Sequence, residues 1–289
     1  MALIMDGRGA YARPAVFGSA IQGDRHEQQD AFRIEWLEED RAWLMILADG
    51  MGGHAAGSVA SALAVENFLA TFKGSRKADE ALHQTLLVAL GAANASLGAW
   101  QRDKPETVGM GTTLVGAFMS VEGLSWVSVG DSPMWLYRDG EISRLNEDHS
   151  FREVAAASGA GNFGNVLQSA LTGQSIPIVD CQPAPLLLQA DDLILLGSDG
   201  MLTLDKSQIE ATVYAAMTRN PELLTSLLLH AIEDQHKPRQ DNCTLIVAAP
   251  DPPMPQVQVV RPARLSLVFL IVALGVTLAC FGYILSGLI

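Results

Sequence analysis

Residues 47–57, LADGMGGHAAG, place one aspartate, four glycines and one histidine directly after the apolar run AWLMILA at 42–48. An apolar run of this length, bounded by glycines, is typical of a buried strand. Asp49 stands where that strand should end. Glycine has no Cβ, so the backbone around Asp49 can close on an ion and lend it a carbonyl oxygen. The stretch therefore predicts a buried strand that ends at a functional carboxylate.

The same arrangement recurs at three other predicted strands. Asp131 follows LSWVSVG (124–130), Asp199 follows DLILLGS (192–198), and Asp241 precedes CTLIVAA (243–249). Strand ends bring side chains that are distant in sequence to one edge, where converging carboxylates raise one another's pKa unless a cation lies between them. Ligand sets made only of oxygen select hard ions, Mg²⁺ or Mn²⁺, over zinc.

The remaining elements favour a layered α+β domain. Residues 55–72 and 79–97 are predicted amphipathic helices, 111–120 is a predicted strand, and 134–145 is a predicted hairpin that turns at Asp139-Gly140. Paired helices between groups of strands, without regular βαβ alternation, are typical of the α+β class.

Composition narrows the class of protein. The 289 residues are 49% hydrophobic and 18% charged, which indicates a folded chain with a real core. A formal net charge of -13 argues against nucleic-acid binding. The three cysteines form no CxxC pair, so they suggest neither a disulfide framework nor a thiolate zinc site, and a reducing compartment fits best. The N-terminal residues lack the apolar region of a secretory signal, so we expect the catalytic part in the cytoplasm.

The C-terminal part is different in kind. Residues 265–289 contain no charged residue or histidine, and as a helix they would reach roughly 37 Å, enough to cross a membrane. The alternative is a buried core helix. Residues 250–264 contain five prolines and are a predicted linker. The expected organisation is thus a catalytic domain at 12–249, a linker at 250–264 and one C-terminal transmembrane helix at 265–289. Arg261 and Arg264 place the catalytic domain on the cytoplasmic side.

Seven motifs occur in a fixed order: RHEQQD (25–30), LADGMGGH (47–54), GMGTTL (109–114), VGDS (129–132), EDHS (147–150), GSDGM (197–201) and QDNCT (240–244). Over about residues 15–248 the chain resembles the bacterial branch of the metal-dependent type 2C Ser/Thr protein phosphatases. The resemblance implies an α-β-β-α sandwich of four layers, with a central antiparallel β-sandwich.

The resemblance also implies roles for single residues. Asp49 would bridge two ions, Mn²⁺ or Mg²⁺. Asp199 and Asp241 would complete the site of the first ion. The Gly50 carbonyl would bind the second ion, and Asp30 would act there through bound water. Asp131 would form with Asp199 a third, weaker position. Arg25 would grip the substrate phosphate, as its planar fork allows. A hydroxide bridging the two ions would then attack phosphorus directly. The implied substrates are phosphoserine and phosphothreonine proteins modified by a Ser/Thr kinase, at a bacterial inner membrane.

Three residues keep two interpretations each. His54 is either the acid for the leaving group or a residue that helps open the following helix. Asn242 either supports the site from behind the ligands or only caps a strand. His149 is either structural or adjacent to the substrate.

The chain departs from the family pattern at Gln28, usually Asn, at GDSP in place of GDSR, and in a shortened segment between Ser150 and 165–173. Two other classes of protein remain as alternatives: a non-catalytic signalling module and a Ca²⁺-binding structural domain. The first is disfavoured by the intact Asp49, Asp199 and Asp241. The second lacks a dense loop of oxygen ligands.

Overall fold

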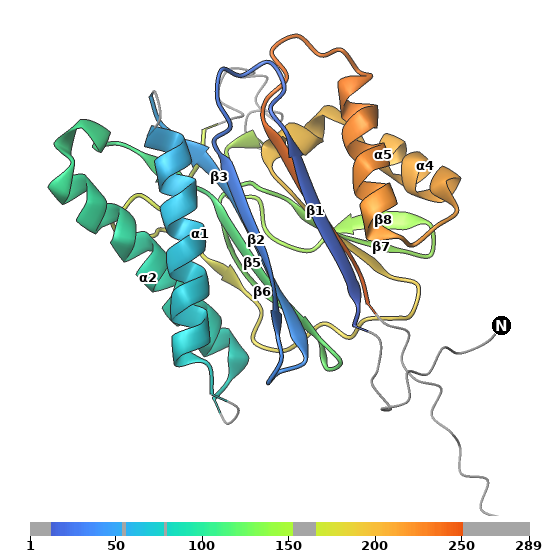
Figure 1. Ribbon diagram of the computed structural model, residues 1–289, viewed down its shortest axis with the longest axis horizontal. Helices are drawn as coiled ribbons and strands as arrows, with labels where there is room; N and C mark the ends of the chain where they lie inside the picture. The colour runs from blue at the N-terminus through green and yellow to red at the C-terminus, as the bar shows by residue number, and fades with distance from the viewer. Residues whose placement is uncertain (1–12, 54–55, 78–79, 153–165, 251–289) are drawn as a thin grey trace, which may run out of the picture. The chain divides into compact units, whose positions relative to one another are not determined.

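A computed structural model describes residues 13–53, 56–77, 80–152 and 166–250 as two antiparallel sheets flanked by helices (Figure 1). The first sheet has the order β1 (Ala15–Ile21), β11 (Cys243–Ala249), β10 (Leu193–Gly197), β7 (Met134–Arg138) and β8 (Glu141–Arg144). The second has the order β2 (Asp30–Leu37), β3 (Ala42–Met51), β5 (Leu114–Ser120), β6 (Gly123–Val129) and β9 (Asp180–Cys181), and the short β4 (Gly111–Thr112) pairs with β3.

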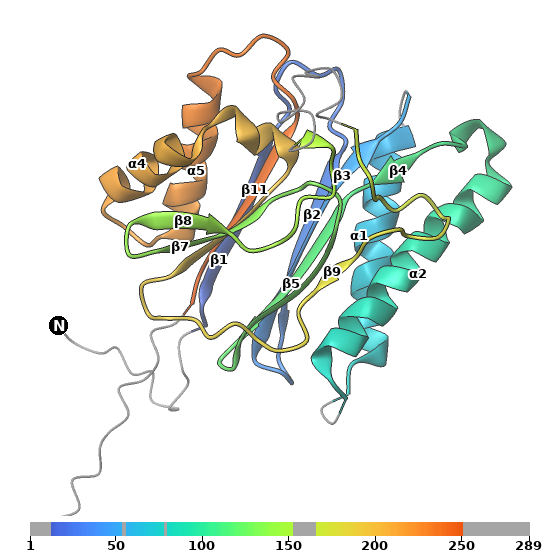
Figure 2. The same cartoon turned by 180° about the vertical axis from the view of Figure 1, so that it is seen from behind.

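Two pairs of helices cover the outer faces of the sheets. Helices α1 (Ala56–Ser75) and α2 (Leu82–Asp103) pack on the second sheet, and α4 (Lys206–Ala216) and α5 (Pro221–Glu233) on the first (Figures 1 and 2). Short 3₁₀ helices follow α2 at Pro105–Thr107 and β10 at Asp199–Thr203, the latter labelled η2. Asp205 caps the start of α4 in a reciprocal capping box with Gln208, which satisfies backbone donors that a helix start leaves free.

The core has three parts because every sheet face is covered. One cluster fills the space between α1, α2 and the second sheet, and another lies between α4, α5 and the first sheet. The third lies between the two sheets and includes Met45 and Leu47 from β3 and Ile194 and Ile246 from β10 and β11, all fully buried. The order of layers is therefore helices, sheet, sheet, helices, and the predicted α+β class with antiparallel sheets is confirmed.

The predicted elements differ from the observed ones mainly at their ends. Strand β11 begins and ends as predicted, and the hairpin turns at Asp139-Gly140, where both residues have positive φ as a two-residue turn requires. Strand β3 continues past residue 48 to Met51, so Asp49 lies inside the strand, near its end, and not after it. The predicted strand at 111–120 is divided into β4 and β5.

Four main elements were not predicted: strands β1 and β2 and helices α4 and α5. The prediction of only two helical blocks was therefore wrong. Strand β2, DAFRIEWL, carries three charged residues, and α4 buries only Ile209 and Val213, so neither has the strong apolar period that indicates a strand or helix.

The predicted transmembrane helix at 265–289 and the linker after Pro250 lie outside the described residues. Within the ranges that the structure describes, no helix combines the length and the apolar character needed to cross a bilayer. The proposed division of the chain at 249 and 264 stays a prediction.

Candidate metal and phosphate site

Strand register brings the first two aspartates together. Asp30 begins β2 and pairs directly with Asp49 near the end of β3. Residues opposite each other on antiparallel strands have Cβ atoms about 5 Å apart. The β2–β3 hairpin thereby places two carboxylates that are distant in sequence at one edge of the second sheet.

The first sheet brings two more aspartates to the same edge. Asp199 begins η2 two residues after β10 ends, and Asp241 stands two residues before β11 begins. A Cβ on Gly200 would lie 2.1 Å from the Asn242 carbonyl oxygen, so only glycine lets these two segments approach so closely. The absence of a side chain at this position is what allows the segments bearing Asp199 and Asp241 to meet.

A cavity of about 730 Å³ opens at this edge. Its wall includes Arg25, Asp49, Asp131, Asp199 and Asp241, together with Gly50 and Asn242. Part of its lining comes from the segment between Val166 and Pro177, which carries no charged residue. Every predicted carboxylate except Asp30 lines this cavity. Asp30 is instead hydrogen-bonded to Ser198 and Thr244.

Burial and mutual repulsion disturb the titration of these groups. Burial raises the pKa of Asp49 well above its ordinary value, and repulsion by Asp30, Asp199, Asp131 and Asp241 raises it further. Burial, with repulsion from its acidic neighbours, also raises the pKa of Asp199 to about 7. A cation bound among these carboxylates would offset the repulsion and favour their ionised forms.

Asp30 links the two sheets. Its Oδ2 accepts hydrogen bonds from Ser198 Oγ at 2.7 Å and Thr244 Oγ1 at 2.8 Å, both from the first sheet's side. Burial raises the pKa of Asp30 to about 6, although these two hydrogen bonds oppose the rise. Its other oxygen, Oδ1, is buried and has no hydrogen-bond partner at normal geometry among the described residues. A buried carboxylate oxygen without a partner carries a desolvation penalty, which a cation or its bound water would relieve.

Threonine hydroxyls fix the backbone of Asp49. Thr113 Oγ1 accepts from the Asp49 N–H at 2.9 Å, and the Asp49 carbonyl accepts from the Thr113 N–H and from Thr112 Oγ1. The Gly50 N–H donates to the Gln29 carbonyl at 3.1 Å, so the Gly50 peptide is held beside the cavity. Thr113, Ser198 and Thr244 were not predicted as site residues. They have no local pattern, and only the motifs GMGTTL, GSDGM and QDNCT around them gave a signal.

Arg25 lies at the mouth of the cavity and contacts Asp241. Its guanidinium is 2.5 Å from Asp241 Oδ2, and 55% of its side chain is exposed. Next to this pair, Asn242 accepts from the Gln29 N–H and donates to the carbonyls of Gln22 and Glu27. Asn242 therefore ties the loop that carries Arg25 to the start of β11, a wider role than a local strand cap.

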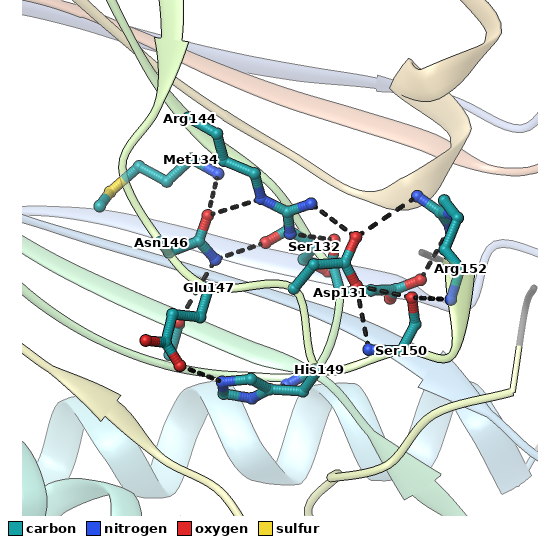
Figure 3. Close-up of polar contacts among 12 residues, drawn as sticks. Asp131, Ser132, Met134, Arg144, Asn146, Glu147, His149, Ser150 and Arg152 are labelled. Atoms are coloured by element: carbon teal, nitrogen blue, oxygen red, sulfur yellow. Dashed lines mark hydrogen bonds and ion pairs between the residues drawn. The ribbon is translucent and has the colours of Figure 1, made fainter. Parts of the chain in front are cut away.

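Asp131 follows β6 and is 5% exposed. Its Oδ2 accepts from Arg152 at 3.1 Å, and its carbonyl accepts from Arg144 at 2.8 Å (Figure 3). Burial raises the pKa of Asp131, and Arg152 acts against the rise. Neither arginine was predicted as a site residue. His149 is buried and accepts from the Gly130 N–H at 3.2 Å, which favours its structural interpretation. His54 lies outside the described residues.

The site has the oxygen ligands that a hard cation prefers, but its side chains are not arranged as a complete set of metal ligands. Among the described side chains, no three His, Cys, Asp or Glu residues form a ready ligand group. Three of the carboxylates have other partners: Asp241 is paired with Arg25, Asp131 with Arg152, and Asp30 with two hydroxyls. The all-oxygen donor set, the unpartnered Asp30 Oδ1 and the raised pKa values nevertheless fit Mg²⁺ or Mn²⁺.

Comparison with known proteins identifies the family. Residues 18–227 match the protein phosphatase 2C family, so the chain belongs to it. Asp241 and Asn242 lie beyond the matched residues. The serine/threonine protein phosphatase PstP of Mycobacterium tuberculosis is 32% identical over 218 residues, which are 72% of this chain and 40% of PstP. The chain thus spans less than half the length of this relative. The serine/threonine phosphatase stp of Listeria innocua is 32% identical over 187 residues, 61% of this chain and 73% of that protein.

Solved structures share the fold. The PstP catalytic domain in complex with two manganese ions is 28% identical, with a TM-score of 0.67 over 82% of this chain and 97% of the other. Stp1 from Staphylococcus aureus, at 24% identity, has a TM-score of 0.72 over 85% of this chain and 99% of the other, a likeness in fold alone.

Proposed function

We propose that this chain is a metal-dependent protein phosphatase that hydrolyses phosphoserine and phosphothreonine on proteins. The observation that carries the proposal is the meeting of buried, mutually repelling carboxylates with an exposed arginine around one cavity. Membership of the protein phosphatase 2C family and the phosphatases among its relatives support it.

Each part of the site has a role in this proposal. Asp49, Asp199 and Asp241, with the Gly50 carbonyl and Asp30 behind them, would hold two ions, Mn²⁺ or Mg²⁺. Such ions supply Lewis acidity and lower the pKa of water so that it attacks phosphorus at neutral pH. Arg25 is exposed at the mouth, where it can leave Asp241 and bind two phosphoryl oxygens through its planar fork. The uncharged residues between Val166 and Pro177 would contact the peptide around the phosphorylated residue.

We further propose that the enzyme acts at a membrane, with its catalytic domain on the cytoplasmic side. The support is the run at 265–289, which has no charged residue, and the arginines at 261 and 264 just before it. Tethering would restrict the enzyme to phosphoproteins that are in the membrane or recruited to it.

A pair of aspartate substitutions tests the reaction. Asp49→Asn keeps the size of the side chain but removes its charge, so hydrolysis of an aryl phosphate with Mn²⁺ should fall roughly a thousandfold or more. The control is Asp139→Asn in the exposed turn of the β7–β8 hairpin, where asparagine also tolerates positive φ. Loss in Asp49→Asn alone is expected. Near-native turnover in a folded Asp49→Asn protein would mean that Asp49 does not hold the catalytic metal, and absence of turnover in the wild type would favour the non-catalytic alternative.

A further inference from the structure

Two arginines enclose the turn that carries Asp131. Arg144, at the end of β8, donates to the Asp131 carbonyl at 2.8 Å and to Asp148 Oδ2 at 2.7 Å. Arg152 donates to Asp131 Oδ2 at 3.1 Å and lies 3.8 Å from Asp148 Oδ2 (Figure 3). Two guanidinium groups thus alternate with two carboxylates.

The turn itself is held rigidly from the other side. Asn146 accepts from the Met134 N–H at 2.8 Å and donates to the Ser132 carbonyl at 2.9 Å. Asn146 and Ser132 are almost fully buried, and Thr113 and Ser132 share a hydrogen bond of 2.7 Å. The backbone of Asp131 is therefore fixed and cannot carry the carboxylate away from Arg152. If the contact between the two side chains breaks, Arg152 must be the one that moves.

Arg152 occupies one of the two Asp131 carboxylate oxygens that a cation could bind. Only 7% of the Asp131 side chain is exposed, and its Oδ2 is already occupied by the guanidinium, whose own side chain is 33% exposed. The charge of Arg152 also reaches Asp199, whose pKa it lowers as it does that of Asp131. These two aspartates are the pair for which the family resemblance implies a third, weaker ion position. A fixed positive charge at this place repels a divalent ion.

We propose that Arg152 is the internal counter-charge of Asp131 and takes the place of a third metal ion in this protein. The site then holds two exchangeable cations and one built-in cation. This inference rests on the proposed metal-dependent function, which it makes more specific.

Counting bound Mn²⁺ tests the inference without reference to activity. The full chain, purified in mild detergent, is titrated with Mn²⁺ by equilibrium dialysis, with free Mn²⁺ read by electron paramagnetic resonance. The wild type should bind two ions. Arg152→Gln should bind a third, at least about tenfold tighter than any third ion on the wild type, because one positive charge beside the position has gone. Arg152→Lys should behave as the wild type does, since it keeps the charge.

Two controls test whether binding of the third Mn²⁺ ion requires Asp131 and the loss of the charge of Arg152 in particular. Arg152→Gln combined with Asp131→Asn should lose the third ion again. Arg219→Ala, which removes an arginine of similar exposure (35%) that pairs with Asp191 at the other end of β10, should leave the count at two. Thermal melting without metal checks that each variant is folded.

Three results would overturn the inference. The first is that wild type and Arg152→Gln bind the same number of Mn²⁺ ions with the same affinity. The second is that the wild type binds three Mn²⁺ ions tightly. The third is that the double variant still binds a third Mn²⁺ ion. A wild type that binds no Mn²⁺ contradicts the proposed metal-dependent function itself, and the inference with it, so the two failures are distinguishable.

Discussion

The exposed Arg25 side chain should matter for catalysis and not for stability. Its side chain is more than half exposed and its only described ion pair is with Asp241, and an exposed pair of this kind contributes little to stability. Its value should therefore appear in catalysis. We expect Arg25→Ala to lower kcat/KM on a phosphopeptide about ten- to a hundredfold, because a charge-assisted contact to phosphate is worth about 1.5–3 kcal/mol.

The control for Arg25 is Arg33→Ala. Arg33 has the same 55% exposure and pairs with Glu66 on the outer surface of β2 and α1. It should keep both activity and melting temperature. If Arg25→Ala and Arg33→Ala have equal efficiency on the phosphopeptide, the phosphate is bound by another residue.

Asp199 allows a test in which pH and metal act together. Its pKa in the folded protein is about 7, above the ordinary 3.8. The folded state then binds more protons than the unfolded state between pH 4 and 7, so without metal this group lowers stability as pH rises through that window. Below pH 4 the carboxyl is protonated in both states and the effect is absent.

Removing the Asp199 charge should remove that penalty. In the presence of a chelator, Asp199→Asn should be more stable than the wild type by up to about 4 kcal/mol at pH 8 and equal to it near pH 4, as measured by urea unfolding. Added Mn²⁺ should stabilise the wild type at pH 8 and have less effect on the variant. A stability difference that does not change with pH would mean that Asp199 is not held among repelling charges.

The sequence predicts the carboxylates better than their surroundings. An aspartate at the end of an apolar strand is visible without a structure, and four of them pointed to one edge. Arg152 could not be predicted from the sequence in this way. Its contact with Asp131 joins residues 21 positions apart and depends on the path of the chain after β8. Ser198 and Thr244 meet Asp30 across 168 and 214 residues for the same reason. The hydrogen bonds that orient a site are long-range, and no spacing in the sequence encodes them.

At the scale of elements, prediction succeeded where one face of an element is strongly apolar. Strand β11 is fully buried and was predicted to the residue, whereas α4 buries two side chains and was not predicted at all. Helix α4 exists because its capping box and its packing on α5 and β8 stabilise it. Tertiary contacts of that kind supply most of a helix's stability and leave a weak trace in the sequence.

The meeting of η2 with β11 is a second element-scale feature that can be tested. Gly200 sits where a Cβ would be 2.1 Å from the Asn242 carbonyl oxygen. Gly200→Ala should push η2 away from β11, lower the unfolding free energy by about 1–3 kcal/mol, and reduce activity with it, because Asp199 and Asp241 move apart. Chemical denaturation and an aryl phosphate assay measure the two effects.

Gly91 provides the matched substitution. It lies exposed inside α2 with no atom near the position of its absent Cβ. Gly91→Ala should raise stability by about 0.5–1 kcal/mol and leave activity unchanged, since alanine is the better helix former. If Gly200→Ala is as well tolerated as Gly91→Ala, the close approach of η2 and β11 does not position the site.

At the scale of the whole molecule, the site exists because two sheets stack. Asp30 and Asp49 lie on strands of one sheet, whereas Asp199 and Asp241 lie next to strands of the other. The packing of apolar inner faces, such as Met45, Leu47 and Ile246, brings the two pairs together. The arrangement of layers followed from the family resemblance. The residues alone predicted a layered α+β domain without the order of its strands, because pairings such as β1 with β11 join the two ends of the domain.

The last prediction concerns the chain beyond the catalytic domain. Arg219 donates to the Pro250 carbonyl at 3.3 Å, so a truncation after Pro250 keeps the described contacts of the domain. We expect the truncated protein to be soluble and to hydrolyse small phosphoesters at the full-length rate, because no residue of the cavity is lost.

Full-length protein should instead remain in the membrane pellet after carbonate washing, as a charge-free run of 25 residues inserts stably. The truncated enzyme should dephosphorylate membrane-bound substrates more slowly than the tethered one, since the proline-rich linker keeps the domain within a few tens of ångströms of the bilayer, about the reach of some fifteen extended residues. Substituting Val272 and Val276 by arginine in the full chain separates loss of the apolar run from loss of length, because charges at the centre of a span oppose insertion. Full-length protein in the carbonate supernatant, or truncated protein still in the pellet, would be incompatible with an anchor at 265–289.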